Sequence, residues 1–110
     1  ILNDYSGAEI DFKKAYEIDS NNKDTFKNLT HFYSAFAANL KDKGEFLKAI
    51  KYHKKLVKID TVNKAAHLSN IGANYRFLKD FDKAVEFYNK SLKIDKSYLT
   101  PYLNLSDIKR

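Results

Sequence analysis

A segment that recurs along the chain constrains the fold more than any other feature of the sequence. Three copies align without gaps, at residues 4–19, 45–60 and 80–95. Each copy starts with an acidic and then an aromatic residue, has Ala three residues after the aromatic, and ends in Ile-Asp. The alanines and the closing aspartates independently give the same steps of 41 and 35 residues: Ala8, Ala49 and Ala84, and Asp19, Asp60 and Asp95. Such a period indicates an array of repeated structural units.

A second segment recurs between the copies of the first, beginning at Phe26, Leu68 and Tyr102. In each copy, a large apolar residue is followed three residues later by Leu or Ile, and the two complete copies add Tyr33 or Tyr75 four residues further on. This spacing is typical of an amphipathic helix. Each repeat is therefore predicted to contain two helices, which gives an all-α solenoid of antiparallel helix pairs with about six helices in total.

Composition agrees with this prediction and excludes several other classes. Only three Gly and one Pro occur in 110 residues, which argues against turn-rich sandwiches and barrels. The absence of Cys excludes disulfide scaffolds, Cys-ligated metals and thiol nucleophiles. No apolar run approaches the roughly 18 residues of a membrane span. We expect a soluble chain whose compartment stays open, with the cytoplasm slightly favoured.

Residues 65–98 carry the cleanest copy of a known pattern: Leu68, Ile71-Gly72, Tyr75, Phe81, Ala84, Tyr88 and Ser91. The pattern resembles the tetratricopeptide repeat, whose unit is about 34 residues long. The resemblance implies a right-handed solenoid in which the first helix of each repeat lines a concave face. It divides the chain into a partial repeat (1–19), a long repeat (23–60), an ordinary repeat (64–95) and a partial repeat (98–110). Since the division cuts repeats at both ends, we expect a fragment of a longer protein.

The long repeat is explained by one extended helix, predicted over about 24–42. When Tyr33 is matched to Tyr75, seven extra residues follow it, and seven residues are close to two helical turns. The added stretch 34–40 should therefore keep its apolar side chains on the same face of the helix. We expect Phe36 and Leu40 to protrude as an exposed overhang that docks a partner or a second copy of the chain, unless the helix over 5–18 or a preceding repeat covers them.

The resemblance also implies a peptide-binding groove on the concave face. Asn28, Asn70 and Asn104 each stand directly before the Leu or Ile of a first helix, where this family presents an amide to a bound peptide backbone. The remaining groove candidates on the same faces are Lys27, His31, Arg76 and Phe77. A clamp for a carboxylate tail, known from chaperone-binding members, is incomplete here because His31 replaces its first Asn, and Thr100 and Asn104 replace its final Lys and Arg.

No catalytic or cofactor chemistry is expected. The three His residues lack the i, i+3 or i+4 spacing of helical zinc ligands, and no glycine-rich phosphate loop occurs. The net charge of +6 raises nucleic acid as a partner, but only two Arg are present and five lysines lie along one face of the helix over 46–59: Lys48, Lys51, Lys54, Lys55 and Lys58. Such a row is typical of a solvated outer face, so nucleic-acid binding is disfavoured.

The sequence thus predicts a non-catalytic scaffold that binds a protein or peptide partner, without cofactor, metal or membrane span. One alternative is a sensory or autoinhibitory arm of a larger signalling or regulatory protein, whose groove another part of the same chain fills. A second alternative is a basic surface for nucleic acid. Self-association through exposed repeat ends is left open.

Overall fold

The computed structural model describes residues 5–18, 22–97, 101 and 104–105. These residues contain no strand and form five α-helices: α1 (Tyr5–Ile18), α2 (Lys23–Asp42), α3 (Phe46–Ile59), α4 (Lys64–Phe77) and α5 (Phe81–Ile94). A short 3-10 turn, Thr61–Asn63, connects α3 to α4. Pro101, Asn104 and Leu105 are also helical and fall within the sixth helix that the sequence predicts, whose other residues lie outside the described part.

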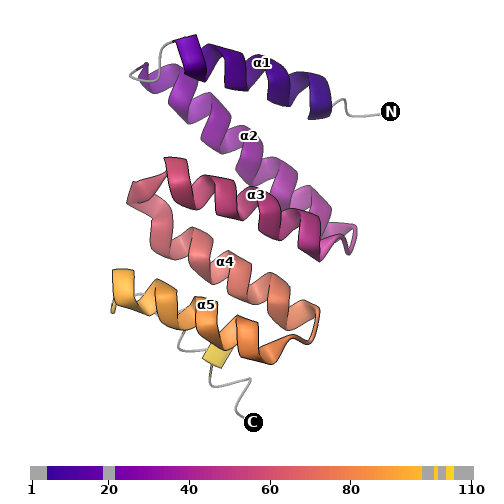
Figure 1. The fold of residues 1–110 in the computed structure, drawn as a ribbon, viewed down its shortest axis with the longest axis vertical. Coiled ribbons are helices and arrows are strands. Elements are labelled where there is room, and N and C mark those ends of the chain that lie inside the picture. The colour runs from indigo at the N-terminus through magenta and orange to yellow at the C-terminus, as the bar shows by residue number, and fades with distance from the viewer. Residues whose placement is uncertain (1–4, 19–21, 98–100, 102–103, 106–110) are drawn as a thin grey trace.

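The helices stack in chain order, each antiparallel to the one before it (Figure 1). Contacts between helices are made mainly by sequence neighbours: α1 with α2, α2 with α3, α3 with α4, and α4 with α5. The prediction of an all-α solenoid of antiparallel helix pairs is confirmed. The extended helix predicted over about 24–42 is α2, which at 20 residues is six longer than the 14-residue α4.

The apolar residues of the two repeated segments form the interior. One cluster joins α3, α4 and α5 through Ile50, Leu68, Ile71, Tyr75, Ala84 and Tyr88. A second cluster joins α2 and α3 through Leu29, Phe32, Tyr33 and Leu56. Since the helical spacing places these side chains on one stripe of each helix, stacking buries one stripe against the next and the array is held together pair by pair.

The turns after α2 and α4 share the same hydrogen bonds at a step of 35 residues. Glu45 N–H donates to the Leu40 carbonyl at 2.8 Å, and Asp80 N–H donates to the Tyr75 carbonyl at 2.9 Å. Each turn also passes through the left-handed region, at Gly44 (φ 80°) and at the non-glycine residue Lys79 (φ 64°). The end of α2 therefore corresponds to the end of α4, with Leu40 in the place of Tyr75.

This correspondence corrects the alignment of the long helix. Sequence reasoning matched Tyr33 to Tyr75 and placed the extra turns at 34–40, whereas the structure places them at the start of α2, within about 23–28. The two alignments differ by seven residues, or about two turns, so both put the apolar stripe on the same face. Sequence periodicity cannot distinguish them, and only the turn geometry fixes the position along the helix axis.

The expected apolar overhang at Phe36 and Leu40 is wrong. Leu40 is 5% exposed, and the Phe36 ring lies 4.6 Å from the Tyr52 ring of α3, centroid to centroid. The reason is the short turn after α2, which sends α3 straight back along the last two turns of α2. Among the described residues, α3, the second helix of the same repeat, provides this cover through Tyr52.

Candidate binding groove

Two hollows along α2, which we call the groove, face the corner after α3 and the side of α4. The first hollow has a volume of about 470 Å³ and is lined by Lys27, Asn28, Thr30, His31, Ser34 and Asp60. The second has a volume of about 170 Å³ and is lined by Ser34, Ala38, Lys41, His53, His67, Asn70, Ala73 and Asn74. Ser34 borders both hollows. The first is closed by Asp60, and the second lies between α2 and α4 with His53 of α3 in its lining.

The structure brings together some of the groove residues that the sequence predicts and separates others. Lys27, Asn28 and His31 line the first hollow, and Asn70 lines the second. At the 35-residue step that relates α2 to α4, the residue that corresponds to Asn70 is Ala35. Asn28 therefore lies seven residues, or about 10 Å, nearer the start of α2 than an evenly spaced row of amides would require.

The third amide of the proposed row, Asn104, is helical and partly buried. It stands 34 residues after Asn70, which agrees with the spacing of ordinary repeats. Most neighbouring residues lie outside the described part, so Asn104 remains a prediction as a groove residue. Thr100, which the incomplete clamp would need on the same helix, also lies outside the described residues.

Phe77 and Arg76, at the end of α4, line neither hollow of the groove, but Phe77 adjoins the second hollow through Lys41. The Phe77 ring is 47% exposed and stacks on Phe46 of α3, with centroids 5.3 Å apart and planes 12° apart. Two cations lie over the same ring: Lys41 Nζ at 5.6 Å and the Arg76 guanidinium at 5.8 Å from its centroid. The end of α4 combines an accessible aromatic surface with positive charge.

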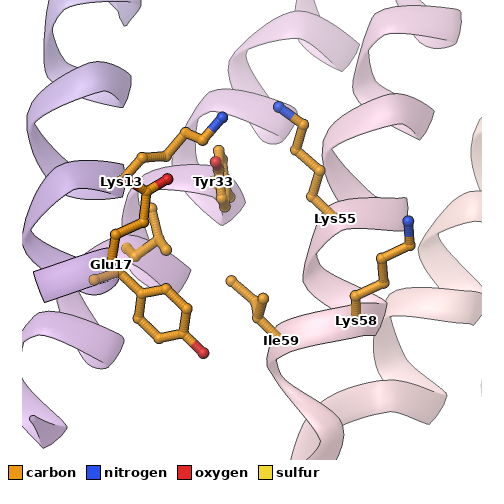
Figure 2. Close-up of a pocket in the computed structure, with 8 residues that line it drawn as sticks. Lys13, Glu17, Tyr33, Lys55, Lys58 and Ile59 are labelled. Carbon is orange, nitrogen blue, oxygen red and sulfur yellow. The ribbon is translucent and has the colours of Figure 1, made fainter. Parts of the chain in front are cut away.

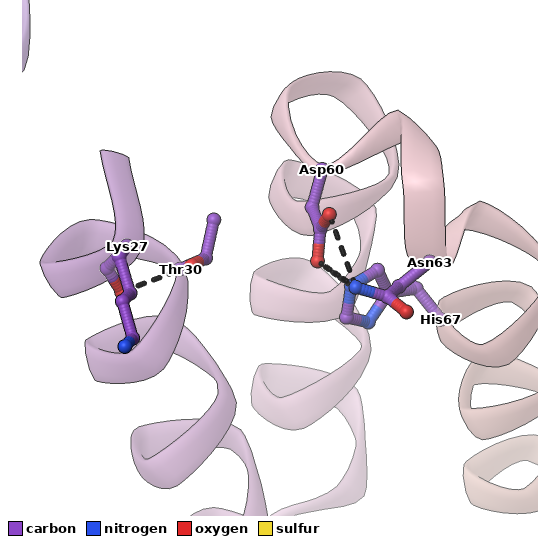
Figure 3. Close-up of polar contacts among 5 residues, drawn as sticks. All are labelled: Lys27, Thr30, Asp60, Asn63 and His67. Carbon is purple, nitrogen blue, oxygen red and sulfur yellow. Dashed lines mark hydrogen bonds and ion pairs between the residues drawn. The ribbon is translucent and has the colours of Figure 1, made fainter. Parts of the chain in front are cut away.

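A hydrogen-bonded cluster lies at the corner between α3 and α4, and its members Asp60 and His67 line the groove (Figure 3). His67 Nε2–H donates to Asp60 Oδ2 at 3.0 Å, and Asn63 Nδ2 donates to both carboxylate oxygens at 3.1 and 3.3 Å. Burial acts to raise the pKa of Asp60, but the hydrogen bonds from His67 and Asn63 outweigh it, and the pKa lies below its usual value. Asp60 is therefore ionised and fixes the orientation of the His67 ring.

His53 lies beside this cluster, with its ring centroid 6.2 Å from that of His67. Burial lowers the pKa of His53 to about 4, and the charges of His67 and Lys41 act in the same direction. The floor of the groove thus carries a neutral imidazole at physiological pH. Within the described ranges, no three His, Asp or Glu side chains are placed to hold a metal ion.

Sequence reasoning missed this polar floor. A signal was present, because Asp60 closes the repeated segment and His67 follows it by only seven residues, at the start of the next helix. His53 is a second signal, since at the 35-residue step it occupies the position of Tyr88, the buried aromatic of the next repeat. The contact between the two histidines depends on the packing of α3 against α4, which spacing alone does not reveal.

Four of the five lysines along α3 are exposed, as expected for an outer face. The fifth, Lys55, is partly buried and forms an ion pair with Glu9 of α1 at 2.8 Å. No helix in the part of the chain that the structure describes is both long and apolar enough to cross a membrane.

Antiparallel helix pairs that repeat at 35 residues and enclose a groove define a helical-repeat protein of the interaction-scaffold class. The sequence model of the tetratricopeptide repeat matches residues 28–97, and the chain belongs to this family. Tetratricopeptide repeats are protein-interaction modules, and this chain contains such a module. No curated protein sequence matches the chain.

A solved structure supports the fold independently of the sequence match. The chain is similar to the N-terminal domain of stress-induced protein-1 (STI-1) from C. elegans, with a TM-score of 0.67 and 19% sequence identity. The similarity covers 97% of this chain and 83% of the other. At this level of identity, the likeness concerns the fold.

Proposed function

We propose that the chain is a non-catalytic scaffold that binds an extended segment of a partner protein in the groove between α2 and α4. The observation that carries this proposal is that two hollows meet at Ser34, with Lys27, Asn28 and His31 lining one and Asn70 lining the other. All four side chains are exposed at the surface. An extended peptide needs donors and acceptors for its backbone, and carboxamides such as Asn28 and Asn70 supply both.

The charge of the groove lining determines which extended peptides it favours. Lys27 and Lys41 line the groove together with one carboxylate, that of Asp60. The lysines and this carboxylate leave one positive charge in excess, which favours a partner segment with acidic residues. The exposed Phe77 at the end of α4 offers an apolar anchor for such a segment.

The proposal is tested with acidic peptides selected from a displayed random library on the purified chain, then measured by fluorescence anisotropy. Asn70→Ala should weaken binding at least fivefold, and Lys27→Ala should weaken it and reduce its salt dependence. Asn89→Ala and Lys93→Ala are the matched controls, since both residues are exposed on α5 outside the groove. Equal effects of the groove and control variants would refute the proposed site.

Nucleic acid is the alternative partner that the same material can test. A basic nucleic-acid surface predicts a retarded band in a gel shift at low salt that is lost steeply as salt rises. We expect no such band, because the groove holds lysines next to carboxamides and the chain has only two Arg. A retarded band abolished by Lys27→Ala would favour nucleic acid instead.

A further inference from the structure

A separate cavity, which we call the α1–α3 hollow, lies where α1, α2 and α3 meet (Figure 2). It has a volume of about 250 Å³ and shares no lining residue with the groove. Its lining is contributed by all three helices: Lys13, Tyr16 and Glu17 from α1, Leu29 and Tyr33 from α2, and Lys55, Lys58 and Ile59 from α3.

The inner wall of the α1–α3 hollow is apolar. Leu29 and Tyr33 are only 2% and 3% exposed and form its deep part, while Tyr16 and Ile59 are partly buried at its sides. The volume leaves room for about eight methylene-sized groups, if each takes up roughly the 30 Å³ of a liquid water molecule. A helix is about 10 Å wide and would not enter. The hollow therefore fits a short aliphatic chain.

The mouth of the α1–α3 hollow is positively charged. Lys55 is already engaged, since its Nζ lies 2.8 Å from Glu9 Oε2 and 5.4 Å from the centroid of the Tyr33 ring. Among the described residues, the amines of Lys13 and Lys58 form no hydrogen bond or ion pair, although the charge of Lys13 acts on Glu9. Figure 2 shows them on opposite sides of the cavity, with the Lys58 amine directed outward. Glu17 opposes them with one negative charge. The balance at the mouth is one positive charge in excess.

We infer that the α1–α3 hollow binds a small amphiphilic carboxylate, with an aliphatic chain against Leu29 and Tyr33 and the carboxylate between Lys13 and Lys58. Apolar burial supplies most of the binding energy in such pockets, and a few charged groups at the mouth fix the orientation. An aliphatic ammonium would place its charge against the two unpaired amines and is disfavoured. The inference does not depend on the groove or on its peptide partner.

The test uses octanoate, with octyltrimethylammonium as the ligand of opposite charge, and follows the assigned methyl signals of the chain by NMR. Octanoate should shift the methyl signals of Leu29 and Ile59 in a saturable manner and leave those of Leu92 unchanged. Lys13→Gln with Lys58→Gln should weaken octanoate binding about fivefold, the order expected for the loss of two exposed ion pairs. Lys93→Gln with Lys96→Gln removes the same charge from the end of α5 and the residues after it, and should have no effect.

Four outcomes would overturn the inference. If octyltrimethylammonium binds as tightly as octanoate, the site recognises only the apolar chain of its ligand. If the signals of all methyl groups shift, octanoate associates non-specifically. Flotation with phosphatidylglycerol vesicles without saturable octanoate binding would assign the lysines to a membrane surface. Displacement of octanoate by a tighter-binding peptide of alternating Leu and Glu would assign the hollow to a protein segment. A denaturation midpoint measured for each variant confirms that the fold is retained.

Discussion

Gly72 lies where α4 crosses closest to α5, and its replacement by Ala tests whether packing or helix propensity decides stability there. A Cβ atom at this position would lie 2.8 Å from both Cδ1 and Cε1 of Tyr88, and 3.2 Å from the carbonyl oxygen of Ala84. Unstrained carbon atoms approach to about 3.5 Å, so the ring or the helix must move by several tenths of an ångström. Tyr88 is fully buried within the core cluster of α3, α4 and α5, so a shift of its ring would disturb other core side chains.

Two effects of opposite sign determine the expected change. In an open helix, Gly→Ala stabilises by about 1 kcal/mol, because Ala restricts the unfolded chain and favours helix. Overpacking a rigid core costs about 1–3 kcal/mol. With a ring edge and a backbone oxygen both in the way, we expect the cost to be larger, and Gly72→Ala to lower the free energy of unfolding by about 1 kcal/mol on balance.

Urea denaturation followed by circular dichroism at 222 nm measures this change, and Tyr88→Leu supplies the matched background. Removing the ring should reverse the sign, so that Gly72→Ala stabilises the Tyr88→Leu variant by up to about 1 kcal/mol. The neighbouring repeat shows that an Ala fits at this position opposite a smaller ring. At the 35-residue step, Ala37 corresponds to Gly72, and His53 corresponds to Tyr88. If Gly72→Ala stabilises the wild-type chain as much as it stabilises the Tyr88→Leu variant, the close approach of α4 and α5 is not what limits the residue at 72.

Replacing Phe36 and Leu40 together by Ser should lower the free energy of unfolding by at least about 3 kcal/mol in the same urea assay, because Leu40 is buried and the partly buried Phe36 packs on Tyr52. The oligomeric state seen by sedimentation should not change, and unchanged stability would contradict this packing. The pKa of His53 is about 4 in the folded chain, so between about pH 6.5 and 4 only the unfolded state takes up the proton. The free energy of unfolding should therefore fall by about 3 kcal/mol as pH drops through this range, and His53→Leu should abolish this loss. A pH profile that His53→Leu leaves unchanged would assign the acid sensitivity to other groups. Ser91→Ala should cost about 1 kcal/mol, because the Ser91 hydroxyl donates at 2.7 Å to the Ala65 carbonyl and links α5 to the start of α4, and an unchanged midpoint would show that this link contributes nothing.

The helices and their pairing could be predicted from the sequence because the periodicity that marks them is local. Spacings of three and four residues define the buried stripe of each helix, and the 35-residue step between Ala49 and Ala84 relates α3 to α5. The position of the extra turns in α2 could not be obtained in this way. A shift of about two turns leaves every side chain on the same face, so Tyr33 and Leu40 are equally good partners for Tyr75 until the turn at Gly44 is seen.

For the groove, the sequence could predict which residues share one face of a helix, but not the shape of the hollow. The sequence placed Lys27, Asn28 and His31 on one side of a helix, and the structure gathers them around one hollow. It could not show that the hollow is closed by Asp60 from the corner after α3, because that contact joins segments about 30 residues apart. The α1–α3 hollow was invisible for the same reason, since its walls come from three helices whose relative positions no local pattern specifies.

The neighbour-to-neighbour packing of the helices also bears on how the chain reaches this structure. Each described helix finds its main partner in the adjacent helix of the sequence, so most contacts between helices form without a distant segment and the loops to be closed are short. Chains with such local contacts fold rapidly, and a helix pair can form as soon as its second member has been synthesised. Folding can then proceed in the order of translation, with α2 and α3 docking before the last helix has left the ribosome.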